Sequence, residues 1–249
     1  MNGDQEEFRV LGEIPDLMAV DKPAGLLVHP SKPGGPKTLW DGLRELLVYE
    51  IANGGQVSLI NRLDRETSGI VLVAKNSAAA RRAAIAMQEG QIHKTYLTLV
   101  AGHPDQDIFS IDAPIIRQGE VTDSRIHLKR TIHPVGAHAL THFTVQKRFE
   151  NRYGKFSLLE ARPITGRTHQ IRVHIASIGH HVVGDKIYGP SEHLYLDFVE
   201  TGWTPRLAEI LHLPRHALHS SGLTIQWGEE TLSWQCKPPQ DFHDFMENS

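Results

Sequence analysis

The sequence predicts an α+β fold built on a mixed or antiparallel β-sheet. The predicted strands are short, and a few helices interrupt them without regular strand–helix–strand alternation. The 249 residues, 40% hydrophobic and 22% charged, fall within the range of globular proteins and are enough to bury a sizeable core. No internal repeat or linker divides the chain, so we expect a single domain.

The N-terminal segment combines a polar tail with two short strands. The polar residues 1–10 are expected to form a flexible tail. Residues 18–21 and 26–30 are predicted strands on either side of a Pro-Gly turn at 22–25. Residues 31–37, rich in proline and glycine, are predicted to form a loop.

A helix, a buried strand and a second helix are predicted next. Apolar residues at helical spacing follow Thr38, a suitable N-cap, and the pattern stops at Gly54. Residues 69–75 are continuously apolar, which is typical of a strand covered on both faces. Ser77 is the predicted cap of an alanine-rich helix that ends at Gly90.

Three longer strands follow. Residues 92–101 are rich in β-branched and aromatic residues, and strand periodicity places Lys94 and Tyr96 on one face. Residues 138–149 and 156–162 show the same character.

The C-terminal half is predicted to contain helices and a strand pair. In order, we expect a helix at 169–178 with Thr168 as N-cap and Gly179 as stop, a helical patch at 207–211, strands at 223–227 and 231–236, and a final helix opened by Pro238 and Pro239.

Cysteine content and hydropathy bear on the cellular location. The single cysteine, Cys236, cannot form an internal disulfide, which is typical of a reducing compartment. No run approaches the roughly 18 apolar residues of a membrane span, and the acidic opening does not resemble an export signal. A cytoplasmic protein without a membrane partner is expected.

Positive charge is concentrated in one segment of the chain. Residues 122–175 contain 10 basic and 3 acidic side chains, although the whole chain has a net charge of −3. Because attraction to phosphate depends on the local field, this segment favours a surface that faces a polyanion. By charge alone, a solvated basic face explains it equally well.

Several common chemistries lack their signatures. The sequence has no phosphate-binding P-loop, no G-x-G-x-x-G, no G-x-S-x-G and no H-E-x-x-H motif. Of the 16 histidines, His138 and His142 would lie about 13 Å apart along a strand. His169 and His174 would not share a helix face. We therefore expect no metal site.

Three segments carry groups capable of chemistry. Residues 61–69 place Asp64 between two arginines just before a buried strand, where a carboxylate needs a partner to stay ionised. Residues 163–174 form a basic turn and helix start that can bind an anion. The third segment, residues 93–97, contains Tyr96. Taken singly, each segment has a more common structural explanation. An aspartate between two arginines is more often part of a loop salt bridge, the basic turn is more often the start of a capped surface helix, and Tyr96 is more often an ordinary aromatic residue of a sheet.

Together the motifs resemble those of the RluA family of pseudouridine synthases over about residues 15–240. The matching motifs, in chain order, are Asp21-Lys22-Pro23-Ala24-Gly25-Leu26, Arg62-Leu63-Asp64-Arg65-Glu66-Thr67-Ser68-Gly69, Lys94-Thr95-Tyr96, Thr165-Gly166-Arg167-Thr168-His169-Gln170-Ile171-Arg172-Val173-His174, Gly179-His180 with Val183-Gly184-Asp185, and Arg215-His216-Ala217-Leu218-His219. Their common order is far more specific than any one motif.

The resemblance implies a pseudouridine synthase fold. Residues 11–249 would form one catalytic domain with a curved, largely antiparallel sheet and a basic cleft for structured RNA. Because the catalytic motifs begin close to residue 1, we expect no separate S4 RNA-binding domain. The implied partner is ribosomal or transfer RNA, not DNA, and no cofactor is implied. A monomer is favoured, although nothing in the residues fixes the oligomeric state.

The resemblance also implies roles for individual residues. Asp64 matches the essential aspartate, Tyr96 the tyrosine that stacks on the target base, and Arg172 the arginine paired with the aspartate. Four more residues match substrate-contacting positions or lie in the same motifs: Arg62, which reaches into the RNA, Val173, which lines the uracil pocket, and Arg167 and His169, without definite roles.

Two residues depart from the family pattern. Asn61 stands where the family usually has histidine, and His181 where it usually has proline. Neither removes a proposed catalytic group. Because the residue beside Arg62 is expected to contact RNA, the first departure bears on the choice of substrate.

One ionised carboxylate is enough for the implied isomerisation. It can attack C1′ to form an ester or remove the 2′ proton to give a glycal, and the sequence leaves both routes open. Two rival functions also remain at this stage. A non-catalytic RNA-binding or chaperone module would use the same basic surface, and a metal-dependent hydrolase would use some of the histidines.

Overall fold

The computed structural model describes residues 8–30 and 34–247, which form two compact units. The first unit contains the described residues up to Lys94 together with His219–Pro238, and the second contains Thr95–Leu218 and the segment from Pro239 onward. Of the expected tail, residues 1–7 lie outside the described part, whereas Arg9 and Val10 already belong to strand β1.

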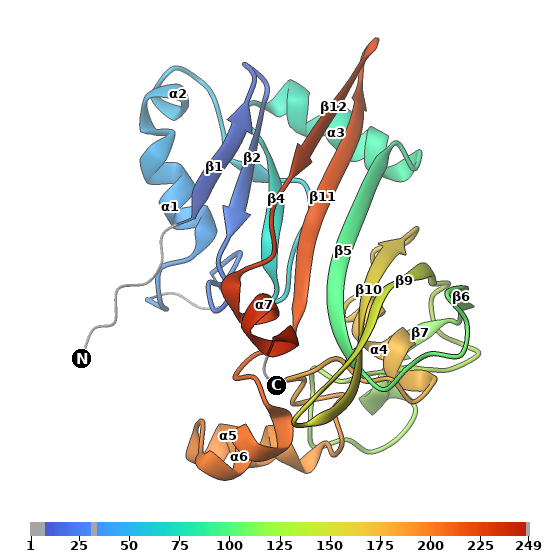
Figure 1. Cartoon of the computed structure of the whole chain (residues 1–249). Helices are drawn as coiled ribbons and strands as arrows, with labels where there is room; N and C mark the ends of the chain where they lie inside the picture. The colour runs from blue at the N-terminus through green and yellow to red at the C-terminus, as the bar shows by residue number, and fades with distance from the viewer. Residues whose placement is uncertain (1–7, 31–33, 248–249) are drawn as a thin grey trace. The chain divides into compact units, whose positions relative to one another are not determined.

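The first unit is built on a mixed sheet with the strand order β1, β2, β4 and β11; β3 also pairs with β4, and β12 pairs with β11 (Figure 1). Its elements are β1 (Arg9–Glu13), β2 (Leu17–Lys22), α1 (Leu39–Leu46), α2 (Val48–Ala52), β3 (Ser58–Leu59), β4 (Ser68–Ala74), α3 (Ser77–Gln88), β11 (Leu218–Trp227) and β12 (Glu230–Gln235). Only the β4–β11 pairing is parallel among these. The predicted mixed, largely antiparallel character is confirmed.

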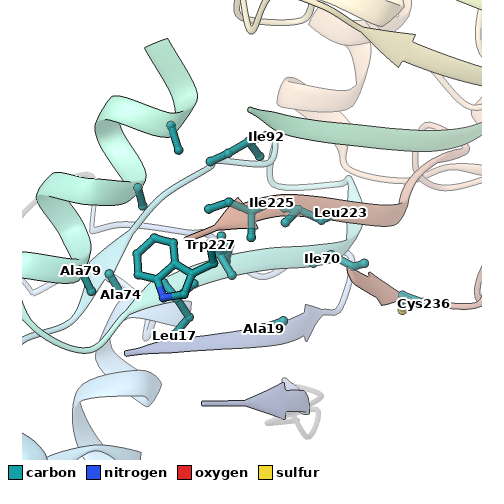
Figure 2. Close-up of a cluster of buried hydrophobic side chains, with 13 residues drawn as sticks. Leu17, Ala19, Ile70, Ala74, Ala79, Ile92, Leu223, Ile225, Trp227 and Cys236 are labelled. Carbon is teal, nitrogen blue, oxygen red and sulfur yellow. The ribbon is translucent and has the colours of Figure 1, made fainter. Parts of the chain in front are cut away.

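The core of this unit lies between its sheet and α3 (Figure 2). Every residue of β4 is buried, as its continuous apolar run predicts. Ala79, Ala83 and Ala86 form the buried face of α3, and their small side chains let the helix approach β4 closely. Trp227 closes the cluster, and the Arg82 guanidinium lies 4.1 Å from its ring centroid.

The single cysteine belongs to this core. Cys236 is buried in the apolar cluster (Figure 2). Burial raises the pKa of its thiol to about 12, so the thiolate is a negligible fraction at neutral pH.

One predicted strand is absent. Residues 26–30 are bends and irregular structure, and the carbonyl groups of residues 26–28 bond outside any sheet. The Leu26 carbonyl accepts a hydrogen bond from Lys22 Nζ. The carbonyls of residues 27 and 28 accept from the first two backbone N–H groups of α1, so the segment caps a helix rather than pairing with a strand.

The predicted helix from Thr38 is confirmed at its start but divides into two. The Thr38 hydroxyl and the Asp41 carboxylate bond reciprocally to each other's backbone N–H groups, which forms a capping box. The helical geometry is interrupted at Leu47, which separates α1 from α2.

The N-cap of α3 is Asn76, and the prediction of Ser77 is wrong by one residue. Asn76 is extended, and its side-chain oxygen accepts from the Ala79 N–H at 2.8 Å, whereas Ser77 is already helical.

We expect Asn76→Ala to lower the free energy of unfolding by about 1 kcal/mol, since an alanine leaves the Ala79 N–H without its cap. Urea unfolding measures the change, and Ser77→Ala is the matched control with an expected change under about 0.5 kcal/mol. A larger loss in Ser77→Ala than in Asn76→Ala would contradict this cap assignment.

The second unit contains an antiparallel sheet in the order β5, β10, β9 and β6, and a separate β7–β8 hairpin. Its elements are β5 (Ile92–Ala101, from its fourth residue), β6 (Ile108–Asp112), β7 (Ile115–Arg117), the 3₁₀ turn Gln118–Glu120, β8 (Arg130–Ile132), β9 (Leu140–Asn151), β10 (Gly154–Pro163), α4 (Gln170–Ser177), α5 (His193–Thr201), α6 (Pro205–Leu211) and α7 (Gln240–Met246). Helix α4 packs against β8, β9 and β10. Among the described residues, no helix has the length and apolar character needed to cross a bilayer.

Candidate functional site

Asp64 lies in a loop of the first unit that leads into β4. Its side chain is half-buried, between the exposed Arg62 and the buried Leu63. The Thr67 N–H donates to the Asp64 carbonyl at 3.1 Å, which closes a tight turn. The aspartate is therefore presented on a turn with an apolar anchor, as the motif predicts.

A fully buried lysine fastens this loop to the preceding Pro-Gly turn. Lys22 Nζ donates to the carbonyls of Pro23, Leu26 and Arg65 at 2.8, 2.9 and 3.1 Å. Arg65 and Gly25 also exchange two hydrogen bonds, from the Gly25 N–H and from Arg65 Nε. An ammonium group has three donors, so three carbonyls offset the cost of its burial. The backbone beside Asp64 is thereby fixed.

A histidine holds the other end of the loop. His219 Nδ1 lies 2.9 Å from Ser68 Oγ, and its Nε2 lies 3.1 Å from the Cys236 carbonyl. Because a carbonyl only accepts, Nε2 carries the proton; in the neutral ring Nδ1 then accepts from the serine hydroxyl. This gives a structural role to the late motif that contains His219.

Asn61, which the motif resemblance places beside a residue that reaches into the RNA, is bonded to the sheet. Its side chain is buried, and its amide bonds to the backbone of β4 at Ile70 and Leu72. A contact of this residue with substrate stays a prediction. The second departure, His181, is half-buried, and burial lowers the pKa of its imidazole.

The second unit contains a buried ion pair that sequence reasoning missed. Arg172, on α4, donates from Nε and Nη2 to the two carboxylate oxygens of Asp185 at 2.6 and 2.8 Å. The side chains are 4% and 0% exposed. A planar guanidinium that donates two hydrogen bonds from one edge to a carboxylate has a fixed orientation. The signal was present in the sequence, because Asp185 follows an apolar Val-Val-Gly run and a buried carboxylate requires a cation.

Asp185 stays ionised despite complete burial. Burial alone would raise the pKa of its carboxyl, but the charge of Arg172 and its hydrogen bonds outweigh burial and hold the pKa well below the usual range. The backbone N–H groups of Ile187 and Tyr188 also donate to Asp185, each at 3.0 Å. The carboxylate thus orients Arg172 and also closes a turn.

Gln170 organises the turn that precedes α4. Its side-chain oxygen accepts from Thr165 Oγ1 at 2.7 Å and from the Arg167 N–H at 3.0 Å. Its Nε2 donates to the Leu140 carbonyl and to Thr141 Oγ1. One buried amide therefore ties the basic turn to β9, a role that sequence reasoning did not assign.

His169 occupies the helix N-cap position, and the prediction of Thr168 is wrong. His169 has φ 58° and ψ 16°, in the left-handed region, and no side chain caps the helix. Its Nδ1 lies 2.8 Å from Tyr188 Oη, which accepts from the Arg130 N–H. A left-handed non-glycine residue is strained, and such strain is concentrated at functional sites.

The remaining predicted residues are placed as follows. Tyr96 is buried on β5, paired in register with Ala161 of β10. Val173 is buried in an apolar cluster with Ile187 and Tyr188. Arg167 is exposed, and its Nε donates to the His138 carbonyl.

The structure brings some of these residues together and leaves other pairings as predictions. Arg172 and His169 meet around Tyr188, whose ring centroid lies 5.0 Å from the Arg172 guanidinium carbon. Asp64 and Arg62 belong to the first unit, and Arg172 to the second. The pairing of Asp64 with Arg172 stays a prediction.

The histidines considered as metal ligands have other partners. His174 bonds Thr141 Oγ1 and the Ala113 carbonyl, and His142 lies 2.6 Å from Ser110 Oγ. His138 pairs with Asp112. In the described ranges, no three His, Cys, Asp or Glu side chains are grouped as a metal site requires.

Comparison with known proteins defines the class. Residues 16–177 match the family model described as RNA pseudouridylate synthase. The chain belongs to this family, and within it to the RluA group whose motifs it shares.

The relatives include bacterial proteins and human structures. An uncharacterized RNA pseudouridine synthase from Chloroflexus aurantiacus is 41% identical over 71% of this chain and 53% of its own length. The ribosomal large subunit pseudouridine synthase D of Haemophilus ducreyi is 33% identical over 96% and 70%. Human RNA pseudouridylate synthase domain containing 1 is 26% identical, with a TM-score of 0.71 over 96% of this chain and 86% of that chain. The chain spans about half the length of the Chloroflexus aurantiacus protein, 53%, and of an uncharacterized RNA pseudouridine synthase from Aquifex aeolicus, 56%.

Proposed function

We propose that this chain is an RNA pseudouridine synthase, an isomerase that converts uridines of structured RNA to pseudouridine without a cofactor or metal. The observation that carries the proposal is the family match over residues 16–177, a range that contains Asp64, Tyr96 and Arg172, the three residues to which the motif resemblance gives catalytic roles. The fixed loop of Asp64 supports it, since catalysis needs a carboxylate held in one direction.

Asp64 is the group that acts on the sugar. It either attacks C1′ to form an ester as the N1–C1′ bond breaks, or removes the 2′ proton to give a glycal. In both routes uracil turns, C5 joins C1′, the C5 proton is released, and N1 gains a proton. In the glycal route the proton taken from C2′ is also returned to C2′ when the new bond forms. Glycosidases use a second carboxylate to activate water; here water must be kept away, so one carboxylate suffices.

Arg172 is the proposed partner of Asp64. Asp185 already engages Nε and Nη2 of Arg172, and the guanidinium fork can hold a second carboxylate through Nη1. Since the Arg172–Asp185 pair is neutral overall, Arg172 would act on Asp64 mainly by direction and hydrogen bonding rather than as an isolated cation.

The other residues bind the RNA in this proposal. Tyr96 stacks on the flipped base. Stacking on an aromatic side chain contributes about 1–3 kcal/mol and offsets part of the free-energy cost of taking the base out of the RNA stack. Val173 lines the uracil pocket, Arg62 reaches into the RNA, and Arg167 and His169 contact it from the turn before α4.

Large-subunit ribosomal RNA is the proposed substrate, with transfer RNA as the alternative. The names of the relatives support the first, since several are ribosomal large subunit pseudouridine synthases D. We propose that the enzyme acts as a monomer in the cytoplasm, where its single buried thiol stays reduced.

Tritium release tests the activity. Total RNA labelled with [5-³H]uridine in cells lacking the gene should lose tritium to water when the full chain is added. Mapping pseudouridines in ribosomal and transfer RNA with and without the gene then identifies the substrate. RNA binding without tritium release would instead favour the non-catalytic RNA-binding module.

Affinity for RNA should fall steeply as salt rises, because residues 122–175 carry 10 basic against 3 acidic groups. Four phosphate contacts would weaken binding about 100-fold between about 50 and 200 mM salt. Filter binding at several salt concentrations measures the slope. A flat dependence would show that this segment is a solvated face rather than an RNA surface.

A further inference from the structure

We infer that Asn61 is a positioning residue for the Asp64 loop, acting through the backbone of β4. The inference rests on the proposed function of Asp64 and gives Asn61 a role that the motif comparison did not assign. It is carried by two hydrogen bonds of the buried Asn61 amide within the first unit.

The edge of β4 is covered by different partners along its length. Near its end, β3 pairs with β4 through Leu59 and Val73, and the Ile60 N–H donates to the Leu72 carbonyl at 2.8 Å. At its start, Ser68 is in register with His219 of β11.

The Asn61 side chain covers the stretch between these partners. Its Nδ2 donates to the Ile70 carbonyl at 3.1 Å, and its Oδ1 accepts from the Leu72 N–H at 2.8 Å. A carboxamide has the donor and the acceptor of a peptide group, so Asn61 acts as one extra rung of the ladder. Without it, two buried backbone groups of β4 would need other partners.

The Asn61 side chain, rather than its main chain, makes the hydrogen bonds to β4, and this determines where the loop leaves the sheet. If Asn61 paired with β4 through its main chain, Arg62 would continue as a strand residue. Because the side chain makes the contacts instead, the main chain turns away at Asn61, and Asp64 lies three residues further along. The Ser68–His219 hydrogen bond fixes the opposite end of the loop.

The choice of amide matters for this geometry. Alanine removes both hydrogen bonds. Histidine, the usual family residue, has ring nitrogens that point in diverging directions, so it can satisfy one β4 group from this position but not both. The structure thus predicts a graded series in which Asn61 holds the loop best, histidine less well, and alanine least.

The test compares Asn61→Ala and Asn61→His with the wild-type chain. The probe is the total RNA labelled with [5-³H]uridine. We measure the single-turnover rate of tritium release at saturating enzyme, the Kd for the same RNA, and the unfolding midpoint. We expect Asn61→Ala to slow the rate about 100-fold, because a displacement near 1 Å has an effect of that size. The rate of Asn61→His should lie between the rates of Asn61→Ala and the wild type. The Kd of each variant for the RNA should differ from the wild-type Kd by less than about threefold.

A stability control separates positioning from folding. Ile225→Val lies in the apolar core of the same unit and lowers stability by about 1 kcal/mol. It should lower the unfolding midpoint but keep the wild-type rate below that midpoint. A wild-type rate in folded Asn61→Ala would overturn the inference. If Asn61→Ala does not fold, a folded Asn61→His with the full wild-type rate would overturn it.

Failure of the proposed function gives a different result. If the wild type releases no tritium, or if Asp64→Asn matches the wild type, the assignment of Asp64 is wrong and the inference falls with it. If Asp64→Asn is inactive while folded Asn61 variants are fully active, only the positioning role is wrong.

Discussion

Asp64→Asn should abolish tritium release, with a rate at least about 10⁴-fold below wild type. An asparagine amide neither attacks C1′ nor removes the 2′ proton at neutral pH, so both routes lose their reactive group. The substitution keeps the size of the side chain and leaves the loop contacts of Lys22, Ser68 and Asn61 in place. RNA affinity should therefore change less than about threefold.

The matched control removes an exposed carboxylate from the same unit. Glu45→Gln, at an exposed ion pair with Lys37, should keep the wild-type rate. Single-turnover tritium release and filter binding measure both variants. Substantial release by folded Asp64→Asn would mean that another group performs the chemistry.

Asp185→Ala should lower the free energy of unfolding by about 3–5 kcal/mol, because it removes the carboxylate that neutralises a buried guanidinium. The exposed pair of Asp197 with Arg206 is the matched control, and Asp197→Ala should change stability by less than about 1 kcal/mol. Urea unfolding at neutral pH measures both, and similar effects of the two substitutions would contradict the importance of burial.

The same pair predicts a pH dependence. The folded-state pKa of Asp185 lies below its unfolded value near 3.9, so the pair stabilises the protein above that value. The stabilisation is lost as pH falls through the folded pKa. The difference in unfolding free energy between wild type and Asp185→Ala should therefore shrink from about pH 5 to about pH 2, and a constant difference over that range would contradict this account.

Sequence patterns predicted elements whose signals are local. The continuous apolar run of β4 and the β-branched residues of β5 gave these strands nearly to the residue. Strands β7 and β8 have three residues each and form through their mutual pairing and a bridge between Ile115 and Ala137, so no local pattern marks them. Residues 26–30 have a strand-like composition, but the Lys22 side chain and the start of α1 bind the carbonyls of residues 26–28.

In the candidate site too, residues with a local sequence signal were predicted, and residues that act through contacts in the folded chain were not. The resemblance supplied Asp64, Tyr96 and Arg172, whose motif positions can be read from the chain. Asp185 and Gln170 were not assigned roles, because each acts through contacts that only the folded chain brings together. The bonding of Asn61 to β4 was not predicted either, since a polar residue beside Arg62 gives no sign that it points inward.

The buried thiol of Cys236 makes the protein convenient for spectroscopic work. A maleimide reacts with thiolate, and this side chain is both inaccessible and almost fully protonated at neutral pH. A cysteine introduced at Tyr49, 77% exposed on α2, would therefore be labelled selectively without deleting the native one. A fluorescent dye at this position can thus test the proposed binding of RNA in a chain with one substitution.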